Sequence, residues 1–212
     1  YEITVFGAEP HPNYNRILLS PVLAGEQTLE EIILNDWSWY AEHGVTLHAG
    51  WTVTGVDRGR RIVHAVNAAG EKLSAPYDRL LMATGSNPFI LPVPGRELPG
   101  VLAYRDIADT QAMIEAASQY KHAVVIGGGL LGLEAANGLM KRGMQFLIGA
   151  QTQELVAGPD GRVAMVRFKD GSEVPAELVV MAVGIRPNTQ LAEQMRLHVD
   201  RGIVVSDTMQ TV

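Results

Sequence analysis

The sequence predicts an α/β fold made of two units with β-meander insertions, and three observations carry that prediction. An apolar strand at 122–126 runs directly into a triple-glycine turn and a helix at 127–143. A short β-branched and aromatic segment at 1–6 ends at a glycine, as strands commonly do. From residue 45 onward hydrophobicity alternates with a period of two, which is typical of half-buried strands.

The composition excludes several classes of function. Of 212 residues, 47% are hydrophobic and 19% charged, enough apolar material for one large domain or two small ones. Lys plus Arg number 17 against 23 Asp plus Glu, so no basic surface for nucleic acid is expected. The absence of cysteine excludes disulfides, thiolate zinc sites and a redox-active cysteine pair, and the six histidines lack metal-ligand spacing. No metal site is expected.

The sequence also predicts no membrane partner and a cytoplasmic location. The most apolar long stretch, 123–140, contains several glycines together with Glu134 and Asn137, which a bilayer would accept poorly. No basic and apolar leader pattern opens the chain. The first residue is Tyr1 rather than methionine, so we expect the sequence to begin inside a longer chain.

The amino-terminal half is expected to hold short helices and then strands. Hydrophobic periodicity and turn residues predict a strand at 1–6, a loop at 11–16, an apolar turn at 17–23, short helices that begin at Thr28 and Asp36, and strands at 45–50, 51–56, 61–66 and 72–85. Prolines and glycines then crowd residues 85–100, which predicts a domain junction. The domains are accordingly predicted at 1–99 and 100–212.

The second half is an α/β unit that looks incomplete. It is predicted to hold a helix at 106–119, the strand at 122–126, the helix at 127–143, a meander within 152–172 and a last apolar strand within 177–189. A βαβαβ unit would still need a strand, a helix and another strand, roughly 30 to 40 residues. We expect this segment to be missing near residues 144–145. Either the given sequence leaves it out and the numbering runs on across the gap, or the protein itself carries a deletion.

The strongest local motif is the glycine turn. Gly127 would permit the tight turn, Gly129 would let the backbone approach a pyrophosphate, and Gly132 would let the helix pack on its strand. The free N–H groups at the start of the helix favour phosphate there. A turn that uses glycine only for packing is the alternative. The acid expected about 20 residues further on is absent, because residues 146–149 read Phe-Leu-Ile-Gly.

Glu9 suggests a second nucleotide-binding half. It follows the strand at 1–6, where the second strand of such a half would place its ribose-binding carboxylate. A first strand and its glycine loop would then lie upstream of Tyr1. The alternative is an acid in a solvated loop, beside Pro10.

Several segments together resemble a known family. They are YEITVFGAEPHPNYNRILLS, YDRLLMATGSNP, VVIGGGLLGLEAANGL, RFKDGS and VVMAVGIRPNT. These resemble the flavoprotein reductases with two dinucleotide-binding domains of the pyridine nucleotide-disulphide oxidoreductase superfamily. Within it, NYNRILLS, the glycine-rich helix and DTMQT are most similar to the amino-terminal FAD and NAD(P)H module of the assimilatory NAD(P)H nitrite reductase large subunit.

The resemblance implies two Rossmann-like domains and a set of site residues. Residues 1–99 would bind FAD, without the first glycine loop, and 100–212 would bind NAD(P)H, carry the meander and begin the return to the FAD domain. The implied contacts are Glu9 with the FAD ribose, Asn15, Arg16 and Ser20 with the flavin, Val53 with the adenine, Thr84 and Gly85 over FAD, Gly127, Gly129 and Gly132 with the nicotinamide nucleotide, and Gly184 at the last strand end. Glu134 would orient the nicotinamide as the one catalytic group.

The resemblance also implies a reaction and its partners. NAD(P)H would give a hydride to FAD, and the electrons would pass to an iron–sulfur and sirohaem module or to a small electron-carrier protein. A homo-oligomer is an open expectation. Two alternatives remain: a stand-alone NAD(P)H reductase for rubredoxin, ferredoxin or oxygen, and a non-catalytic remnant that keeps only the scaffold. Pro21 stands where related reductases often carry a lysine after the serine, so no salt-bridge partner for Glu134 is expected.

Overall fold

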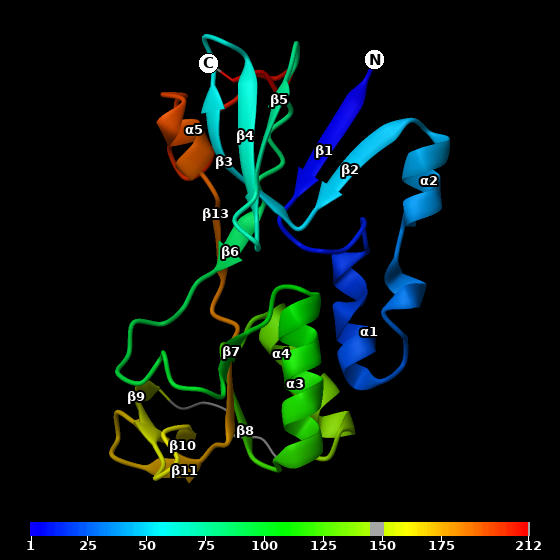
Figure 1. Cartoon of the computed structure of the whole chain (residues 1–212). Helices are drawn as coiled ribbons and strands as arrows, with labels where there is room; N and C mark the ends of the chain where they lie inside the picture. Colours follow the sequence, from blue (N-terminus) through cyan, green and yellow to red (C-terminus); the bar gives the residue numbers. More distant parts are fainter. Residues whose placement is uncertain (145–150, 212) are drawn as a thin grey trace. The chain divides into compact units, whose positions relative to one another are not determined.

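The computed structural model describes residues 1–144 and 151–211, and its contacts divide the chain into two compact units (Figure 1). Unit 1 comprises Tyr1–Tyr14, Ile33–Ser86 and Pro187–Val212, and unit 2 comprises Asn15–Ile32 and Asn87–Arg186. Both units mix helices with strands, and parallel strand pairs occur in each, which confirms the predicted α/β class. Across the described ranges, no helix has the length and apolar character needed to span a bilayer.

Unit 1 is built from a parallel strand pair, an antiparallel three-stranded sheet and two short helices. Its elements are β1 (Ile3–Gly7), α2 (Trp37–Glu42), β2 (Val45–Ala49), β3 (Trp51–Asp57), β4 (Ile62–Asn67), β5 (Lys72–Pro76) and α5 (Gln190–Gln194). Two further strands, β6 (Ser86–Pro88) and β13 (Ile185–Pro187), pair with each other, and the unit boundaries fall within them.

Unit 1 begins with a parallel strand pair that places Glu9 at the strand ends. β1 pairs in parallel with β2, from Ile3 opposite Val45 to Gly7 opposite Ala49. The chain leaves β1 at Gly7, and the N–H of Gly50 donates to the carbonyl oxygen of Glu9 over 2.9 Å. This bond holds the backbone of Glu9 at the ends of both strands.

Unit 2 contains a parallel sheet, a β meander and three helices that pack together. Its elements are η1 (Arg16–Leu18), α1 (Leu19–Ala24), η2 (Glu30–Ile32), β7 (Val101–Ala103), α3 (Ile107–Gln119), β8 (Ala123–Ile126), α4 (Leu130–Lys141), β9 (Thr152–Ala157), β10 (Val163–Phe168), β11 (Glu173–Pro175) and β12 (Leu178–Met181). β12 lies between β7 and β8 and is parallel to both, and all its residues are buried. It is thus the centre of this sheet.

The meander shares one apolar core with the sheet of unit 2. Strands β9, β10 and β11 pair antiparallel in that order, and their inward side chains pack against β8 and β12. The buried members of this core are Val124, Leu155, Val163, Val166, Phe168, Ala176, Val179 and Met181. Unit 2 therefore buries its sheet between the meander and helices rather than leaving it exposed to solvent.

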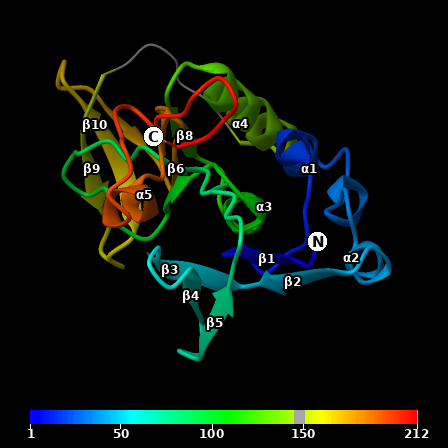
Figure 2. The same cartoon turned by 90° about the horizontal axis from the view of Figure 1, so that it is seen from above.

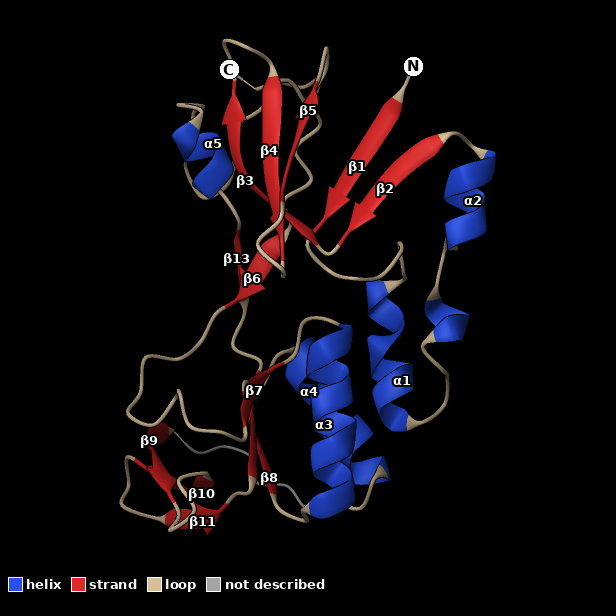
Figure 3. Cartoon of the chain, viewed as in Figure 1, coloured by secondary structure: helices blue, strands red, loops and turns tan. Residues whose placement is uncertain are grey.

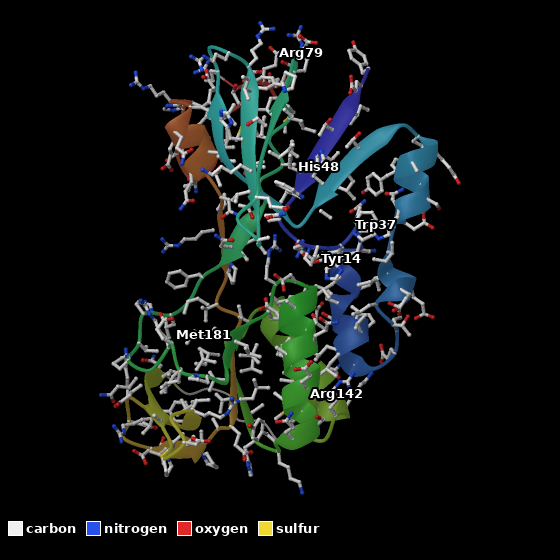
Figure 4. All side chains as sticks on the ribbon, viewed as in Figure 1. Tyr14, Trp37, His48, Arg79, Arg142 and Met181 are labelled. Carbon is white, nitrogen blue, oxygen red and sulfur yellow. The ribbon has the colours of Figure 1, made fainter. Side chains whose placement is uncertain are left out.

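Helix α1 lies along α4, as Figures 1 and 2 both show, and Figure 3 shows α3 beside them. A Cβ atom at Gly138 of α4 would lie 2.7 Å from Cγ of Leu23, a fully buried residue of α1, so only glycine allows this approach. Arg142, labelled in Figure 4, donates to the carbonyl oxygens of Leu23 and Val22 at the end of α1. Lys141 pairs with Glu26 just beyond that end.

Two sequence expectations were wrong. The segment 17–23 was expected as a turn, but Leu19–Ala24 forms helix α1, in which Pro21 occupies the first turn, where no backbone N–H is needed. Residues 77–85 were expected to continue a strand, yet the ladder ends at Pro76 and the next strand is β6. The expected break near 144–145 falls against residues 145–150, which lie outside the described ranges.

The Glu177 side chain ties the start of β8 to the start of β12. It accepts hydrogen bonds from the backbone N–H groups of Lys121 and His122 and faces Nδ1 of His122. The bond from the Lys121 N–H, followed by those from His122, lowers the pKa of Glu177 below its ordinary 4.5 despite opposing desolvation.

The lowered pKa predicts a pH dependence of stability. Stabilisation by the Glu177 carboxylate is fully present above pH 4.5 and is lost as the pH falls through the lower, folded value. Glu177→Gln should therefore reduce the free energy of unfolding at pH 7 and flatten its decline between pH 5 and about pH 3. Urea unfolding at several pH values measures both effects. Glu115→Gln on α3 is the control, and an equal response of the two variants would contradict the assignment.

Candidate functional site

The predicted glycine turn lies between β8 and α4. At two of its glycines an added side chain would overlap the backbone, and at two others it would meet open space. Gly127 has a φ of +122°, and a Cβ there would lie 2.2 Å from the carbonyl oxygen of Ala182. A Cβ on Gly132 would lie 2.0 Å from the carbonyl oxygen of Gly127. Apart from the adjoining residues of the chain, no described heavy atom lies within 4 Å of a Cβ built on Gly128 or Gly129.

These contacts separate two uses of glycine. At Gly127 and Gly132, packing of strand, turn and helix accounts for the residue by itself, so these positions do not distinguish a nucleotide site from a packing turn. Gly129 is the N-cap of α4 and is exposed, and as a glycine it has no side chain that could accept a hydrogen bond from the first N–H groups of the helix. The turn thus presents open backbone and the positive end of a helix, where an anionic group is favoured.

Two predicted site residues from distant parts of the sequence meet beside this turn. Ser20 of α1 donates from Oγ to Oε2 of Glu134, in α4, over 2.8 Å. The hydroxyl of Tyr104 donates in turn to Oγ of Ser20 over 3.1 Å. Tyr104 is only 2% exposed, and burial raises its pKa to about 12, opposed in part by the bond to Ser20.

The other residues predicted to line a flavin within unit 2 are held by backbone groups. Asn15 is the N-cap of η1, and its side chain accepts from the N–H of Ile17 over 3.2 Å. Arg16 donates from Nη1 to the carbonyl oxygen of Arg105 over 2.8 Å. Asn15, Arg16, Ser20 and Glu134 therefore all belong to unit 2.

In unit 1 the predicted ribose-binding carboxylate has a fixed orientation. The hydroxyl of Tyr14, a buried residue labelled in Figure 4, donates to Oε2 of Glu9 over 2.6 Å. Val53 is half-buried in β3, opposite Ala65 of β4. The structure places Glu9 and Val53 in the same unit, and their contact with a nucleotide stays a prediction.

The segment of Thr84 and Gly85 is hydrogen-bonded to Asn188. Thr84 Oγ1 donates to the carbonyl oxygen of Asn188 over 2.7 Å, and Nδ2 of Asn188 donates to the carbonyl oxygen of Thr84 over 2.9 Å. The N–H of Asn188 donates to the carbonyl oxygen of Gly85 over 2.9 Å. In unit 2, Gly184 is exposed after β12, and its carbonyl oxygen accepts from the N–H of Phe89.

Sequence reasoning did not find Tyr104 or Asn188. Tyr104 follows β7, a strand of three residues that was too short to be predicted, and its role depends on a contact 84 residues away in sequence. Asn188 stands in the IRPNT segment, but only the fold shows that it binds Thr84. Within the described ranges no group of His, Asp and Glu side chains could hold a metal ion.

Comparison with known proteins assigns the family. The model for "pyridine nucleotide-disulphide oxidoreductase" matches residues 1–148 and 136–212. The chain belongs to this family. Its members typically bind FAD and NAD(P)H, and the matched residues include both the Glu9 segment and the glycine turn.

Curated relatives and solved structures agree with this family. The chain is 48% identical over 244 residues to a nitrite reductase [NAD(P)H] of Bacillus subtilis (strain 168). The alignment covers 100% of this chain and 30% of that protein. It is 34% identical to the nitrite reductase (NADH) large subunit of Escherichia coli (strain K12), over 100% of this chain and 28% of that protein. The chain thus spans 28–30% of the length of these relatives.

Among solved structures, a chain of a covalent putidaredoxin reductase–putidaredoxin complex matches with a TM-score of 0.88. It is 29% identical, and the match covers 99% of this chain and 58% of that one. A ferredoxin reductase from Rhodopseudomonas palustris matches with a TM-score of 0.85 at 25% identity, over 99% of this chain and 59% of that one.

The closed glycine contacts predict a difference in stability between neighbouring variants. Gly132→Ala would drive a methyl group into the Gly127 carbonyl and should lower the free energy of unfolding by about 1–3 kcal/mol. Gly128→Ala adds a methyl group with no atom within 4 Å outside the adjoining residues and should change this free energy by less than about 0.5 kcal/mol. Urea denaturation compares the two. Equal stability of both variants would show that α4 does not rest on the turn as described.

Proposed function

We propose that the chain is the FAD- and NAD(P)H-binding module of an NAD(P)H nitrite reductase, passing a hydride from NAD(P)H to FAD and electrons onward to an acceptor. The observation that carries this proposal is the 48% identity to the Bacillus subtilis nitrite reductase across the whole chain. The open glycine turn and the orientation of Glu9 agree with it.

The residues of unit 2 fit a nicotinamide nucleotide. The uncovered backbone at Gly128 and Gly129 leaves room for a pyrophosphate, and the uncapped start of α4 supplies N–H groups and a positive dipole end. Gly127 and Gly132 bring strand and helix close enough for this geometry. Glu134 is the proposed orienting group for the nicotinamide.

The residues predicted for FAD fit it within each unit. In unit 1, Glu9 is a carboxylate held by Tyr14 and suited to ribose hydroxyl groups, and Asn188 fixes the backbone of Thr84 and Gly85. Bound FAD would supply the acceptor for a hydride and release electrons singly. The protein groups only bind and orient, because hydride transfer needs no general acid or base from the chain.

We also propose the domain division at 1–99 and 100–212 and the missing segment near 144–145. Two findings support the segment. The family model matches in two pieces that overlap at 136–148, and the alignment with the Bacillus subtilis protein runs over 244 residues for a chain of 212.

The proposed electron acceptor lies on another segment or partner, since the chain has no cysteine to bind an iron–sulfur cluster. An iron–sulfur and sirohaem module is favoured by the nitrite reductase relatives. The likeness to putidaredoxin reductase, solved with putidaredoxin, supports a small carrier protein as the alternative acceptor. Such a module would work in the cytoplasm.

A flavin reduction assay tests the proposal. The purified chain mixed with FAD should show a bound-flavin absorbance band, which anaerobic NADH or NADPH should bleach, and an artificial dye should then restore it. Adding nitrite reductase catalytic module or a small iron–sulfur protein in place of the dye distinguishes the two acceptors. A protein that retains no flavin and oxidises neither nucleotide would refute the proposed enzyme activity and favour the non-catalytic remnant.

The open position at Gly129 predicts a selective loss of nucleotide binding. Gly129→Val should weaken NAD(P)H binding by at least about tenfold, because its side chain would occupy the space through which a pyrophosphate approaches, while FAD stays bound. Fluorescence titration with NADH measures the change. Gly202→Val in unit 1, whose Cβ meets only an ordinary contact with Pro187, is the control. Unchanged affinity in folded Gly129→Val would contradict nucleotide binding at this turn.

A further inference from the structure

Three side chains from three elements form a hydrogen-bonded chain in unit 2. Tyr104 follows β7, Ser20 lies in α1, and Glu134 lies in α4. The Tyr104 hydroxyl donates to Ser20 Oγ over 3.1 Å, and Ser20 Oγ donates to Glu134 Oε2 over 2.8 Å. This series of hydrogen bonds therefore runs from the buried phenol of Tyr104 to the half-buried carboxylate of Glu134, two residues after Gly132.

The direction of these bonds is fixed by chemistry. An ionised carboxylate only accepts hydrogen bonds, so the single proton of Ser20 must point to Glu134. The Ser20 oxygen is then left as an acceptor, and the Tyr104 hydroxyl must donate to it. Because burial raises the pKa of Tyr104 to about 12, the phenol keeps its proton at neutral pH.

No cation takes part in this arrangement. Pro21 follows Ser20 and has no charged group, and Glu134 has no salt bridge within residues 1–144 and 151–211. A serine hydroxyl alone can rotate among three staggered positions, and a glutamate side chain has three rotatable bonds. The hydrogen bond that Ser20 accepts from Tyr104 selects the one orientation of the serine hydroxyl that points at the carboxylate.

The backbone next to Tyr104 is itself restrained. Arg16 donates to the carbonyl oxygen of Arg105 over 2.8 Å, and Oδ2 of Asp109 accepts from the N–H of Arg105 over 2.6 Å. Both peptide groups of Arg105 are thus held by side chains, one from η1 and one from α3. The Tyr104 ring is buried beside this held backbone, and its hydroxyl donates to Ser20.

We propose that Tyr104 is a positioning residue, which fixes the orientation of the Glu134 carboxylate through the hydroxyl of Ser20. The inference deepens the proposed function, because Glu134 is the group proposed to orient the nicotinamide. Tyr104 acts only through Ser20, so its effect depends on the serine hydroxyl being present.

A double-mutant cycle tests this dependence. Tyr104→Phe removes only the hydroxyl and keeps the buried ring, and Ser20→Ala removes the middle group. Each variant should reduce the rate of flavin reduction by NADH about five- to tenfold at saturating nucleotide, which is the effect of one lost hydrogen bond. The KM for NADH should change less than about threefold. The double variant should equal Ser20→Ala. Multiplying effects in the double variant would overturn the proposal.

A second measurement needs no flavin and no reaction. In the full chain labelled with ¹³C-glutamate, the carboxyl signal of Glu134 is assigned by its loss in Glu134→Gln. Tyr104→Phe and Ser20→Ala should each shift this signal, and Tyr104→Phe should shift it no further in the Ser20→Ala background. A signal that does not respond to Tyr104→Phe would overturn the proposal, even where NADH fails to reduce the flavin and the proposed function falls.

Tyr120→Phe is the matched control for both measurements. Tyr120 is the C-cap of α3 in the same unit, and its ring lies under the Arg162 guanidinium, 5.2 Å from the centroid. Phenylalanine preserves that contact, so flavin reduction and the Glu134 signal should both match the wild type. A response equal to that of Tyr104→Phe would mean that loss of any phenol disturbs unit 2, which would overturn the specific role of Tyr104.

Discussion

The arrangement of unit 2 depends on backbone groups that approach too closely for any side chain to intervene. Gly127 lies against the Ala182 carbonyl of the central strand end, and Gly132 lies against the Gly127 carbonyl. Because a Cβ at either position would overlap a backbone oxygen, α4 rests directly on the turn that follows β8. The position of α4 in turn fixes every group that it carries, including Glu134 in its first turns and Arg142 at its end.

A second close contact then brings α1 to α4. Gly138 leaves the space that the buried Leu23 side chain fills, and Arg142 satisfies carbonyl groups at the end of α1, which a short helix leaves without partners. Once these two helices touch, Ser20 comes within hydrogen-bond distance of Glu134. The site geometry of unit 2 is therefore a consequence of helix packing, and the polar bond adds direction to a contact that apolar burial establishes.

The sequence predicts best what is determined locally. The capping box of Thr28 and Glu31 forms both of its hydrogen bonds, and Asp36 caps α2 as expected, because each signal lies within four residues. The strand, glycine turn and helix at 123–141 also follow from local pattern. Helix α1 was missed, since six residues with a proline gain their stability from α4 rather than from propensity. Residues 77–85 are apolar enough for a strand, yet strand formation needs a partner, which hydrophobicity alone does not reveal.

The same distinction explains why Glu134 could be predicted and its partner could not. A glutamate two residues after the last glycine of the turn is visible in the sequence, whereas Tyr104 contributes through a contact that only the packing of β7, α1 and α4 creates. Holding a carboxylate by hydroxyl groups also differs physically from holding it by an ammonium group. A charged partner at a half-exposed site is screened by water and salt and is free to move. A hydrogen bond donated by a buried phenol gives less attraction but a single direction, and direction is what a group needs if its role is to orient a ligand.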